Sequence, residues 1–396
     1  MKEIAALVPK RQGEACADNY LPDDKAFAAW LEAETNLVVY APCRAVAATR
    51  NPRGEIESVL IRSVRTGEDF RLAGAFFADC TGDASLAECA GAETRWDAEP
   101  REETAEPIAP PKGERRRAGA LGSTCQWYSR EAAGPRPFPD CPWALRIDKD
   151  EEALVGDEIG KDWLHSGGWN WETGFYRDPV REGEAIRDHN FRAVYGFWDY
   201  LKNRSPFREK HVNGEIYFLA YVLGKRDAHR IVGDYVLTAN DLLENRVYPD
   251  GVVTTTWYLD LHFPHPALSR KFPDGEFRAA AFGDPDWERA VGERRWVGKS
   301  LTIRAYPIPF RSFYSRDVPN LLMAGKNISG TYAALSSYRV QNTAGMMGTM
   351  VGRAVSLCLK FGLTPRALGR DRLDALKALL ADPGPSRAAA GADAGK

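Results

Sequence analysis

Residues 76–93 read FFADCTGDASLAECAGAE, and this stretch decides the fold. The apolar run at 75–79 is of the kind that is buried in a parallel sheet, and it ends at Thr81-Gly82-Asp83 before a short predicted helix at 84–90. A glycine at the end of a buried strand lets a cofactor approach the backbone closely, and free N–H groups of the turn can face a phosphate or a polyol. The alternative interpretation is an ordinary strand–turn–helix corner, in which Asp83 caps the helix.

The sequence before this stretch predicts one helix and a set of strands. An amphipathic helix opens at Pro22-Asp23-Asp24, with acidic residues where the helix dipole favours them. Strands are expected over 37–40, 44–49 and 56–64, and a turn at 65–68 leads to a further strand-like segment at 70–72. Asn51-Pro52-Arg53-Gly54 predicts the tight turn between the strands at 44–49 and 56–64.

The composition of the chain changes after residue 93. Residues 94–120 are rich in Glu, Arg and Pro and predict an exposed excursion or linker. Ten of the 11 tryptophans lie between Trp96 and Trp296. Residues 182–202 carry apolar side chains on one helical face, and residues 252–263 predict a strand.

A second informative stretch, PNLLMAGKNISGTYAALSSYRVQNTAGMMGTMVGRAVSLCLKFGLTP, covers residues 319–365. It predicts a strand at 321–324 that ends at Gly325-Lys326-Asn327, and a long helix from about Ser337 to Lys360 that stops at Gly362 and Pro365. Ser336 or Ser337 is the expected cap of that helix. Glycines inside a helix cost roughly 1 kcal/mol each, so Gly345, Gly348 and Gly352 indicate close packing along one face.

Composition narrows the class of protein. The 396 residues carry a net charge of -2, so no basic field indicates a nucleic-acid partner. The seven cysteines occur singly, which argues against a structural zinc site or a disulfide scaffold and favours a reducing, cytoplasmic location. The segment at 1–20 lacks the apolar run of a signal peptide, and the helix near the end is too polar to cross a bilayer. The composition does not predict an oligomeric state.

These two stretches resemble the FAD-dependent oxidoreductases, flavoproteins built on a nucleotide-binding Rossmann-like domain. Residues 76–93 are similar to the strand-to-turn segment of that family, and residues 319–365 to the segment in which its chain returns to the flavin. Residues 170–203 and 230–242 are similar to its middle region, so the resemblance extends over about 20–370. It implies an α/β fold, FAD as cofactor and a small organic molecule as substrate.

The resemblance also implies roles for individual residues. A helix N-terminus after the second strand would point at the flavin pyrimidine, where reduction places negative charge. Arg339 would lie near this charge or near an acidic substrate group, and His262 and Tyr332 are the other candidate catalytic residues. The candidate cofactor-binding residues are Val46, Thr81, Gly82, Asp83, Gly325, Lys326, Asn327, Ser329, Val340 and Gln341.

The sequence departs from the family pattern at three places. Thr331-Tyr332-Ala333-Ala334 stands where family members usually carry Thr-His-Val-Ala, and a tyrosine transfers protons less readily than a histidine near neutral pH. Residues 348–352 read Gly-Thr-Met-Val-Gly where the family often has Gly-Gln-Ala-Ala-Gly. No G-x-G-x-x-G motif, which holds the ADP pyrophosphate, occurs in the sequence. The chain is therefore expected to begin after that motif and to bind FAD weakly or not at all.

Two weaker sets of residues remain. Asp260, His262 and His265 have a spacing that could chelate a metal, but the intervening prolines interrupt the geometry, and we expect no metal site. Trp169, Trp171 and Glu172 could line a substrate pocket, whereas burial in the core of the middle region is the simpler expectation for each tryptophan.

The expected architecture is an incomplete FAD/NAD(P)-binding Rossmann-like domain with an inserted mixed α+β substrate domain. Residues 1–95 would form the remaining part of the FAD-binding domain, 96–300 the inserted middle domain, 301–370 the return of the chain to the FAD-binding domain, and 371–396 a disordered tail. The expected function is two-electron redox chemistry on a small organic substrate. The alternatives are a non-catalytic ligand-binding remnant that has lost its ADP site, and a start codon placed downstream of the true one.

Overall fold

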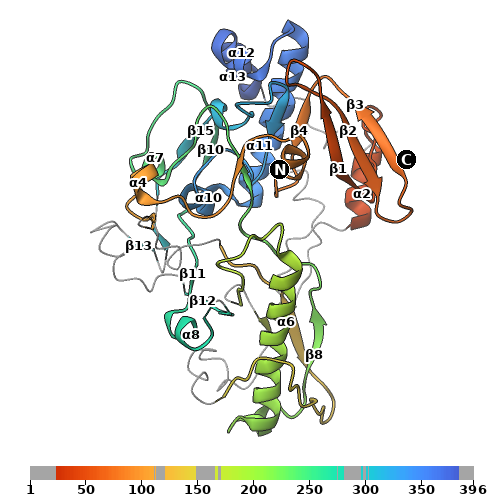
Figure 1. The fold of residues 1–396 in the computed structure, drawn as a ribbon, viewed down its shortest axis with the longest axis vertical. Helices are drawn as coiled ribbons and strands as arrows, with labels where there is room; N and C mark the ends of the chain where they lie inside the picture. The colour runs from red at the N-terminus through yellow and green to blue at the C-terminus, as the bar shows by residue number, and fades with distance from the viewer. Residues whose placement is uncertain are drawn as a thin grey trace, which may run out of the picture.

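The chain folds into an upper and a lower lobe (Figure 1). The upper lobe holds β1 to β4 and the helices near the C-terminus, and the lower lobe is built around α6 (Gly183–Asp199) and β8 (Gly214–Leu219). The computed structural model describes residues 24–110, 112, 121–148, 166–167, 171–273, 275–280, 296–297, 300–301 and 303–382.

A three-stranded antiparallel sheet follows the first described helix, α2 (Asp24–Glu32). It consists of β1 (Cys43–Arg50), β2 (Ile56–Ser63) and β3 (Asp69–Ala73), paired in the order β1-β2-β3. Asn51 builds the first hairpin turn, because its side-chain oxygen accepts from Arg53 N at 2.9 Å. The strands expected at 44–49, 56–64 and 70–72 are thus confirmed.

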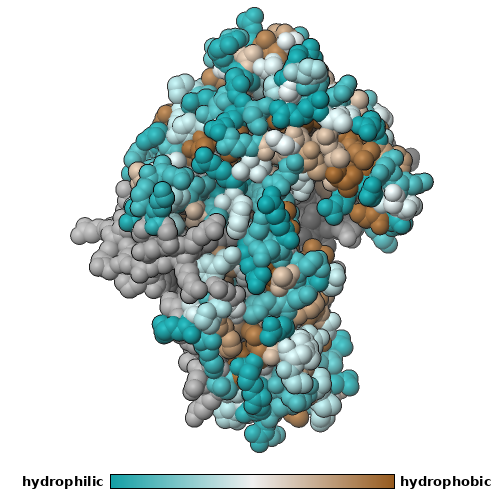
Figure 2. All heavy atoms as spheres, in the orientation of Figure 1, coloured by the Kyte–Doolittle hydropathy of each residue, from teal (hydrophilic) through white to brown (hydrophobic). Residues whose placement is uncertain are grey.

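The strand expected at 37–40 is wrong. These residues form an irregular segment, and Leu37, Val38, Val39 and Tyr40 are 45 to 73% exposed. An apolar run becomes a strand only where another strand pairs with it, and none does so among the described residues. Figure 2 shows further apolar side chains gathered on the face over the β1–β3 region.

A parallel pair of short strands joins distant parts of the sequence. β4 (Phe77–Asp79) lies beside β16 (Leu321–Met323), with Phe77 opposite Leu321 and Asp79 opposite Met323. β4 leads into α3 (Ser85–Cys89), which packs against β1. Asn320 fixes the entry to the pair, because its side-chain amide donates to Ile56 O at 2.8 Å and to Ala75 O at 3.1 Å.

Two hydrophobic cores lie in different parts of the chain. The first combines residues from β2, α3, β16 and the C-terminal helices with residues 228–263 and 306–335. The second is aromatic and combines Trp127, Trp171, Phe197, Trp198 and Phe277 with α6. Residues 228–263 therefore pack mainly in the first core, together with β2, α3 and β16, although the domain boundaries themselves stay a prediction.

The lower lobe sets α6 against a small antiparallel sheet. The helix expected over 182–202 is confirmed as α6, which continues as a π-helical turn over Tyr200–Arg204. The sheet has the order β7-β6-β8, with β6 at Trp127–Glu131 and β7 at Ser166–Gly167. The strand expected over 252–263 is shorter, because only β10 (Gly251–Thr255) and β11 (Phe263–Pro264) are extended and paired.

The remaining elements complete the two lobes. They are β5 (Thr94–Arg95), α4 (Arg101–Thr104), the 3-10 turn Arg208–His211, β9 (Arg230–Ile231), α7 (Ala239–Leu243), α8 (Pro266–Lys271), β12 (Ala279–Ala280), β13 (Trp296–Val297), β14 (Ser300–Leu301), β15 (Tyr306–Pro309) and the 3-10 turn Phe310–Ser312.

Helices end the described chain. The long helix expected from about Ser337 to Lys360 is present but begins later, because α10 (Tyr332–Tyr338) and α11 (Gln341–Phe361) are separate and Val340 between them is extended. Gly362 stops α11 with a φ of 64°, as expected from its sequence. The disordered tail was expected from residue 371, but the chain is still helical there. After α12 (Pro365–Asp371), α13 (Leu373–Ala381) follows, and its Leu376 is fully buried. Residues 383–396 lie outside the described residues.

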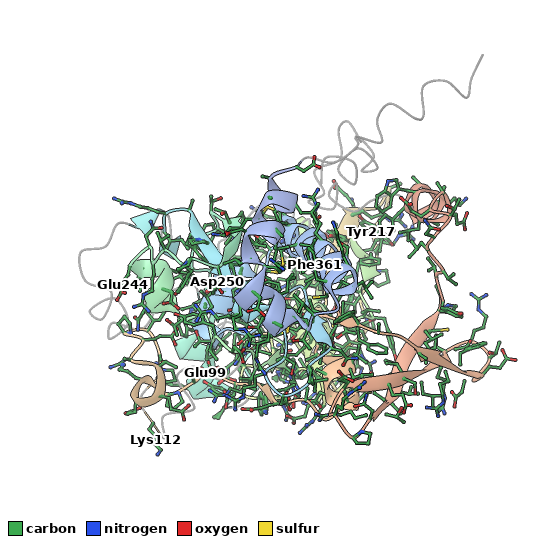
Figure 3. The ribbon with its side chains drawn as sticks, turned by 90° about the horizontal axis from the view of Figure 1, so that it is seen from above. Glu99, Lys112, Tyr217, Glu244, Asp250 and Phe361 are labelled. Atoms are coloured by element: carbon green, nitrogen blue, oxygen red, sulfur yellow. The ribbon has the colours of Figure 1, made fainter. Side chains whose placement is uncertain are left out.

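Viewed from above, β1–β3 project to one side of the molecule, while Glu99 and Asp250 lie on the other side of α11 (Figure 3). Within the described ranges, no helix is both long enough and apolar enough to span a membrane.

Candidate functional site

Two glycine turns meet at the end of the parallel strand pair. Parallel strands place their carboxyl ends at the same edge, so the turn after β4 and the turn after β16 lie side by side. Gly82 and Gly325 have φ values of 74° and 117°, which only glycine adopts without strain. Lys326 Nζ lies 3.3 Å from Asp83 Oδ1. The two turns therefore approach each other in space.

The buried carboxylate of Asp79 holds the two turns together. Its Oδ1 accepts from Thr81 N at 3.0 Å, Thr81 Oγ at 2.7 Å and Asn327 Nδ2 at 3.1 Å. Its Oδ2 accepts from Ala87 N in α3 at 2.9 Å. Asp79, which sequence reasoning overlooked, therefore organises the corner, and Asp83 does not cap α3. An acidic residue at the last position of an apolar strand was the signal for it.

Two of the expected cofactor-binding side chains are buried, and a third makes its contact within the protein. Asn327 and Ser329 are buried, and the Thr81 hydroxyl is engaged by Asp79. Their side chains shape the turns, whereas Gly82, Asp83, Gly325 and Lys326 are only partly buried. A contact of Asn327 or Ser329 with a cofactor stays a prediction.

Val46 lies at an irregularity in β1. Ala45 pairs with Ile61 and Ala47 with Leu60, so the register shifts at Val46 and no residue of β2 stands opposite it. Such a bulge re-aims the backbone locally and is common beside functional sites. Because β1 packs against α3, the bulge lies on the element that contacts the helix after the Gly82 turn.

The break between α10 and α11 changes the expected helix start. Ser336 and Ser337 are buried inside α10 and cap nothing, since Ser337 Oγ donates to Trp257 O at 2.6 Å. Thr331 caps α10 instead, accepting from Ala334 N at 3.2 Å. Val340 precedes α11, whose first residue, Gln341, is exposed. Arg339 lies at the junction of the two helices.

A buried charged cluster surrounds His262. We call the acid–base cluster the set formed by Glu172, Arg226, Asp260, His262 and Arg339. His262 Nδ1 contacts Glu172 Oε1, and His262 Nε2 lies 3.1 Å from Asp260 Oδ1. Arg339 Nη2 donates to Asp260 Oδ2 at 3.0 Å, and Arg226 Nε lies 3.4 Å from Glu172 Oε1. The structure thus brings together His262 and Arg339, which were predicted separately.

The charges of the acid–base cluster shift the protonation of its members. Burial alone would lower the pKa of His262, but the charge of Glu172 and the hydrogen bond with Asp260 outweigh burial and raise it. Burial alone would raise the pKa of Asp260, but His262 and Arg339 outweigh burial and lower it. The cluster therefore favours an ionised Asp260 and a protonated His262.

Tyr332 lies beside the cluster without joining its ion pairs. Its hydroxyl donates to His262 O at 3.4 Å, and the side chain is only 4% exposed. Burial raises the pKa of this phenol well above its ordinary value, so it stays protonated near neutral pH. Its position lets it support the His262 backbone, and its role in catalysis stays a prediction.

Residues 225–227 connect the glycine turns to the acid–base cluster. Lys225 forms an ion pair with Asp83, and Asp227 O accepts from Lys326 Nζ. Arg226, between them, faces Glu172. Sequence reasoning missed Lys225 and Arg226, although three consecutive charged residues directly after the apolar stretch at 216–224 were a usable signal.

The structure places the two weaker sets of candidate residues, the possible metal ligands and the possible substrate-pocket residues, in different surroundings. Both ring nitrogens of His262 face carboxylates, and the described part of the chain contains no group of three or more candidate metal ligands. Trp171 is 3% exposed and packs on Trp127, Phe197 and Phe277, as core burial requires. Trp169 lies outside the described residues, and Glu172 belongs to the acid–base cluster.

Comparison with known proteins gives one match. The family model described as FAD dependent oxidoreductase covers residues 11–380. That family binds FAD on a Rossmann-like fold, in keeping with the mixed helices and strands of this chain. Searches of curated proteins and of solved structures gave no match.

Proposed function

Because the chain belongs to the FAD dependent oxidoreductase family, we propose that it carries out two-electron redox chemistry on a small organic substrate. One observation carries the proposal beyond the family: residues 225–227 join the paired glycine turns to a buried acid–base cluster. Three consecutive residues thus contact both the proposed cofactor-binding turns and the groups proposed to transfer protons. The proposed architecture is a Rossmann-like domain with a substrate domain inserted at 96–300, of which residues 228–263 pack in the first core.

The paired turns fit a phosphate- and polyol-bearing cofactor. Gly82 and Gly325 present backbone without side chains, and Lys225 and Lys326 place two ammonium groups around Asp83. These residues would hold FAD, with the bulge at Val46 as a further backbone contact. Gln341 and Val340, at the open start of α11, are the proposed contacts of the ring.

When bound, FAD supplies the two-electron acceptor or donor. The residues of this chain supply charge and protons around it. Arg339 keeps its positive charge at every physiological pH and fixes Asp260 at 3.0 Å. His262 holds a proton on Nε2, which faces Asp260. Because the Asp260 side chain is 25% exposed, a substrate would reach the acid–base cluster from this side.

The functional test is flavin binding followed by reduction. The purified chain is titrated with FAD and, separately, with riboflavin, and flavin fluorescence reports binding. We expect FAD to bind weakly and riboflavin more weakly still, since only FAD carries the diphosphate that the two lysines would contact. No FAD binding up to about 1 mM, equivalent to roughly -4 kcal/mol, would contradict the proposal.

The second stage uses flavin-saturated protein. Small organic substrates are added without oxygen, and bleaching of the flavin absorbance reports two-electron reduction. A chain that binds small aromatic ligands but neither binds nor reduces flavin would instead be a ligand-binding protein.

A further inference from the structure

Glu172 is the most buried member of the acid–base cluster, and its surroundings hold it in one position. Its side chain has no solvent exposure. Oε1 faces both His262 Nδ1 and Arg226 Nε, whereas Oε2 is buried without a hydrogen-bond partner. A fully buried carboxylate with one unused oxygen is costly, so its retention in the fold needs a reason beyond stability.

Gly122 provides the space that Glu172 occupies. A Cβ atom at this position would lie 2.7 Å from Glu172 Cβ and 2.8 Å from Glu172 Oε2, closer than real contacts allow. Arg226 ties the same segment to the cluster, because its Nη1 donates to Gly122 O at 3.2 Å and to Thr124 Oγ1 at 2.7 Å. Glycine is thus required here for close approach of a side chain, and Glu172 cannot move away from His262 without disturbing Arg226.

The two carboxylates that face His262 differ in their access to water. Glu172 on the Nδ1 side is fully buried, and Asp260 on the Nε2 side is 25% exposed. Loss of the Nε2 proton leaves Nδ1–H donating to Glu172. Loss of the Nδ1 proton would leave a buried carboxylate facing a nitrogen lone pair, which is far less favourable. The remaining charges around the ring, Arg226 and Arg339, act through these two carboxylates.

Building on the proposed function, we infer that Glu172 is a positioning residue, which makes Nε2 of His262 the atom that gives up and receives the proton of the reaction. In this step the Nε2–H bond breaks, the proton moves to a basic atom of the substrate, and His262 is left neutral with its remaining proton on Nδ1. In the opposite direction the substrate proton returns to Nε2. No electrons are transferred in the step.

A second histidine of the same chain provides a matched control. His229 also lies between two carboxylates, with Nδ1 2.6 Å from Glu88 and Nε2 2.9 Å from Asp178. It packs against Trp96 and lies outside the acid–base cluster. Glu88→Gln therefore removes one carboxylate from a similarly placed histidine without touching His262.

The test reads the protonation of His262 directly, in protein without added flavin. Long-range 1H–15N spectra of 15N-histidine-labelled protein are recorded over a pH series, with His262→Asn used to assign the signals. We expect wild-type His262 to carry both protons at neutral pH and to keep Nδ1–H when it becomes neutral. In Glu172→Gln, the acid dissociation constant of His262 should rise at least tenfold. In Glu88→Gln, the His262 signals should stay unchanged.

Gly122→Ala is the second variant, because it displaces Glu172 without removing its charge. We expect the same direction of change and a smaller size. A neutral wild-type His262 protonated on Nε2 would overturn the inference, as would an unchanged titration in Glu172→Gln. These spectra need no bound cofactor, so failure to bind FAD would count against the proposed function and leave the role of Glu172 to be decided by the titration.

Discussion

Lys326 Nζ lies 3.3 Å from Asp83 Oδ1, although 243 positions separate the two residues in the sequence. Lys225 contacts the same carboxylate, and the side chains of Asp83 and Lys326 are only 17 and 18% exposed. Burial alone lowers the pKa of Lys326, so its ammonium group depends on nearby acceptors to stay charged. Two partly desolvated cations, Lys225 and Lys326, thus lie around the Asp83 carboxylate at the paired turns.

Replacing Lys326 by Met tests whether this charge serves FAD. The variant keeps the length of the side chain and removes one cation, and we expect FAD to bind about tenfold more weakly, equivalent to about 1.4 kcal/mol. Isothermal titration calorimetry gives the affinity. Lys271→Met, at a solvent-exposed pair with Asp148, is the control and should leave it unchanged. Equal affinities in all three proteins would remove Lys326 from the cofactor site.

Glu106 makes stability depend on pH in an unusual direction. The residue is 1% exposed, and burial raises its pKa from 4.5 to about 7, although Thr331 Oγ1 donates to it at 2.6 Å. With a raised pKa, its contribution to stability is fully present below about pH 4.5 and is lost as pH rises through about 7. We expect Glu106→Gln to raise the free energy of unfolding at pH 8 by ~1–3 kcal/mol relative to wild type, and to have little effect at pH 5. Urea unfolding at both values is the measurement, and a stabilisation of equal size at pH 5 would contradict this account.

Glu88 and Asp178 produce the opposite dependence. Burial alone would raise both pKa values, but His229 lowers that of Glu88, and the backbone of residues 180–181 together with His229 lowers that of Asp178. Depressed carboxylate pKa values stabilise the fold above the ordinary values of 4.5 and 3.8, and this contribution is lost as pH falls below them. His229→Gln should therefore cost about 3 kcal/mol at pH 7 and flatten the acid side of the stability profile.

The control for this prediction is His189→Gln. His189 contacts Gly275 O at 2.7 Å, and its replacement should cost about 1 kcal/mol. Thermal unfolding of both variants between pH 3 and 7 separates the two cases. Identical losses, with the same acid dependence, would show that the two carboxylates do not act through His229.

The strand–turn segments were predictable because their signals are local. An apolar run that ends in Thr81-Gly82 predicts a buried strand and a tight turn without any knowledge of the partner strand. The family resemblance predicted that residues 319–365 return to the same domain, whereas the parallel pairing with residues 321–323 is seen only in the structure. The segment at 37–40 has the same apolar character, but pairing decides whether such a run becomes a strand, and pairing is not encoded locally.

The acid–base cluster was only half predictable. His262 and Arg339 stood out by residue type, whereas Glu172 and Arg226 acquire their roles from contacts across 90 and 54 positions. The helix break at Val340 was not predictable from the sequence because it, too, depends on tertiary packing. Residues 332–361 have uniform helical character in sequence, and the packing of α10 into the core buries Ser336 and Ser337, the residues expected to cap a helix.

Arg339 offers the sharpest test of the redox site, given flavin-loaded protein. It lies between α10 and α11 and pairs with the partly buried Asp260, so it is not the exposed surface partner of a carboxylate that would contribute at most about 1 kcal/mol. A fixed positive charge near the flavin stabilises the anionic reduced form. We expect Arg339→Met to lower the two-electron potential by about 30 mV, equivalent to about 1.4 kcal/mol, and to slow reduction by substrate. Arg353→Met, further along α11, is the control and should leave the potential unchanged. Dye-equilibration titration gives the potentials, and an unchanged value in Arg339→Met would place the flavin away from the α10–α11 junction.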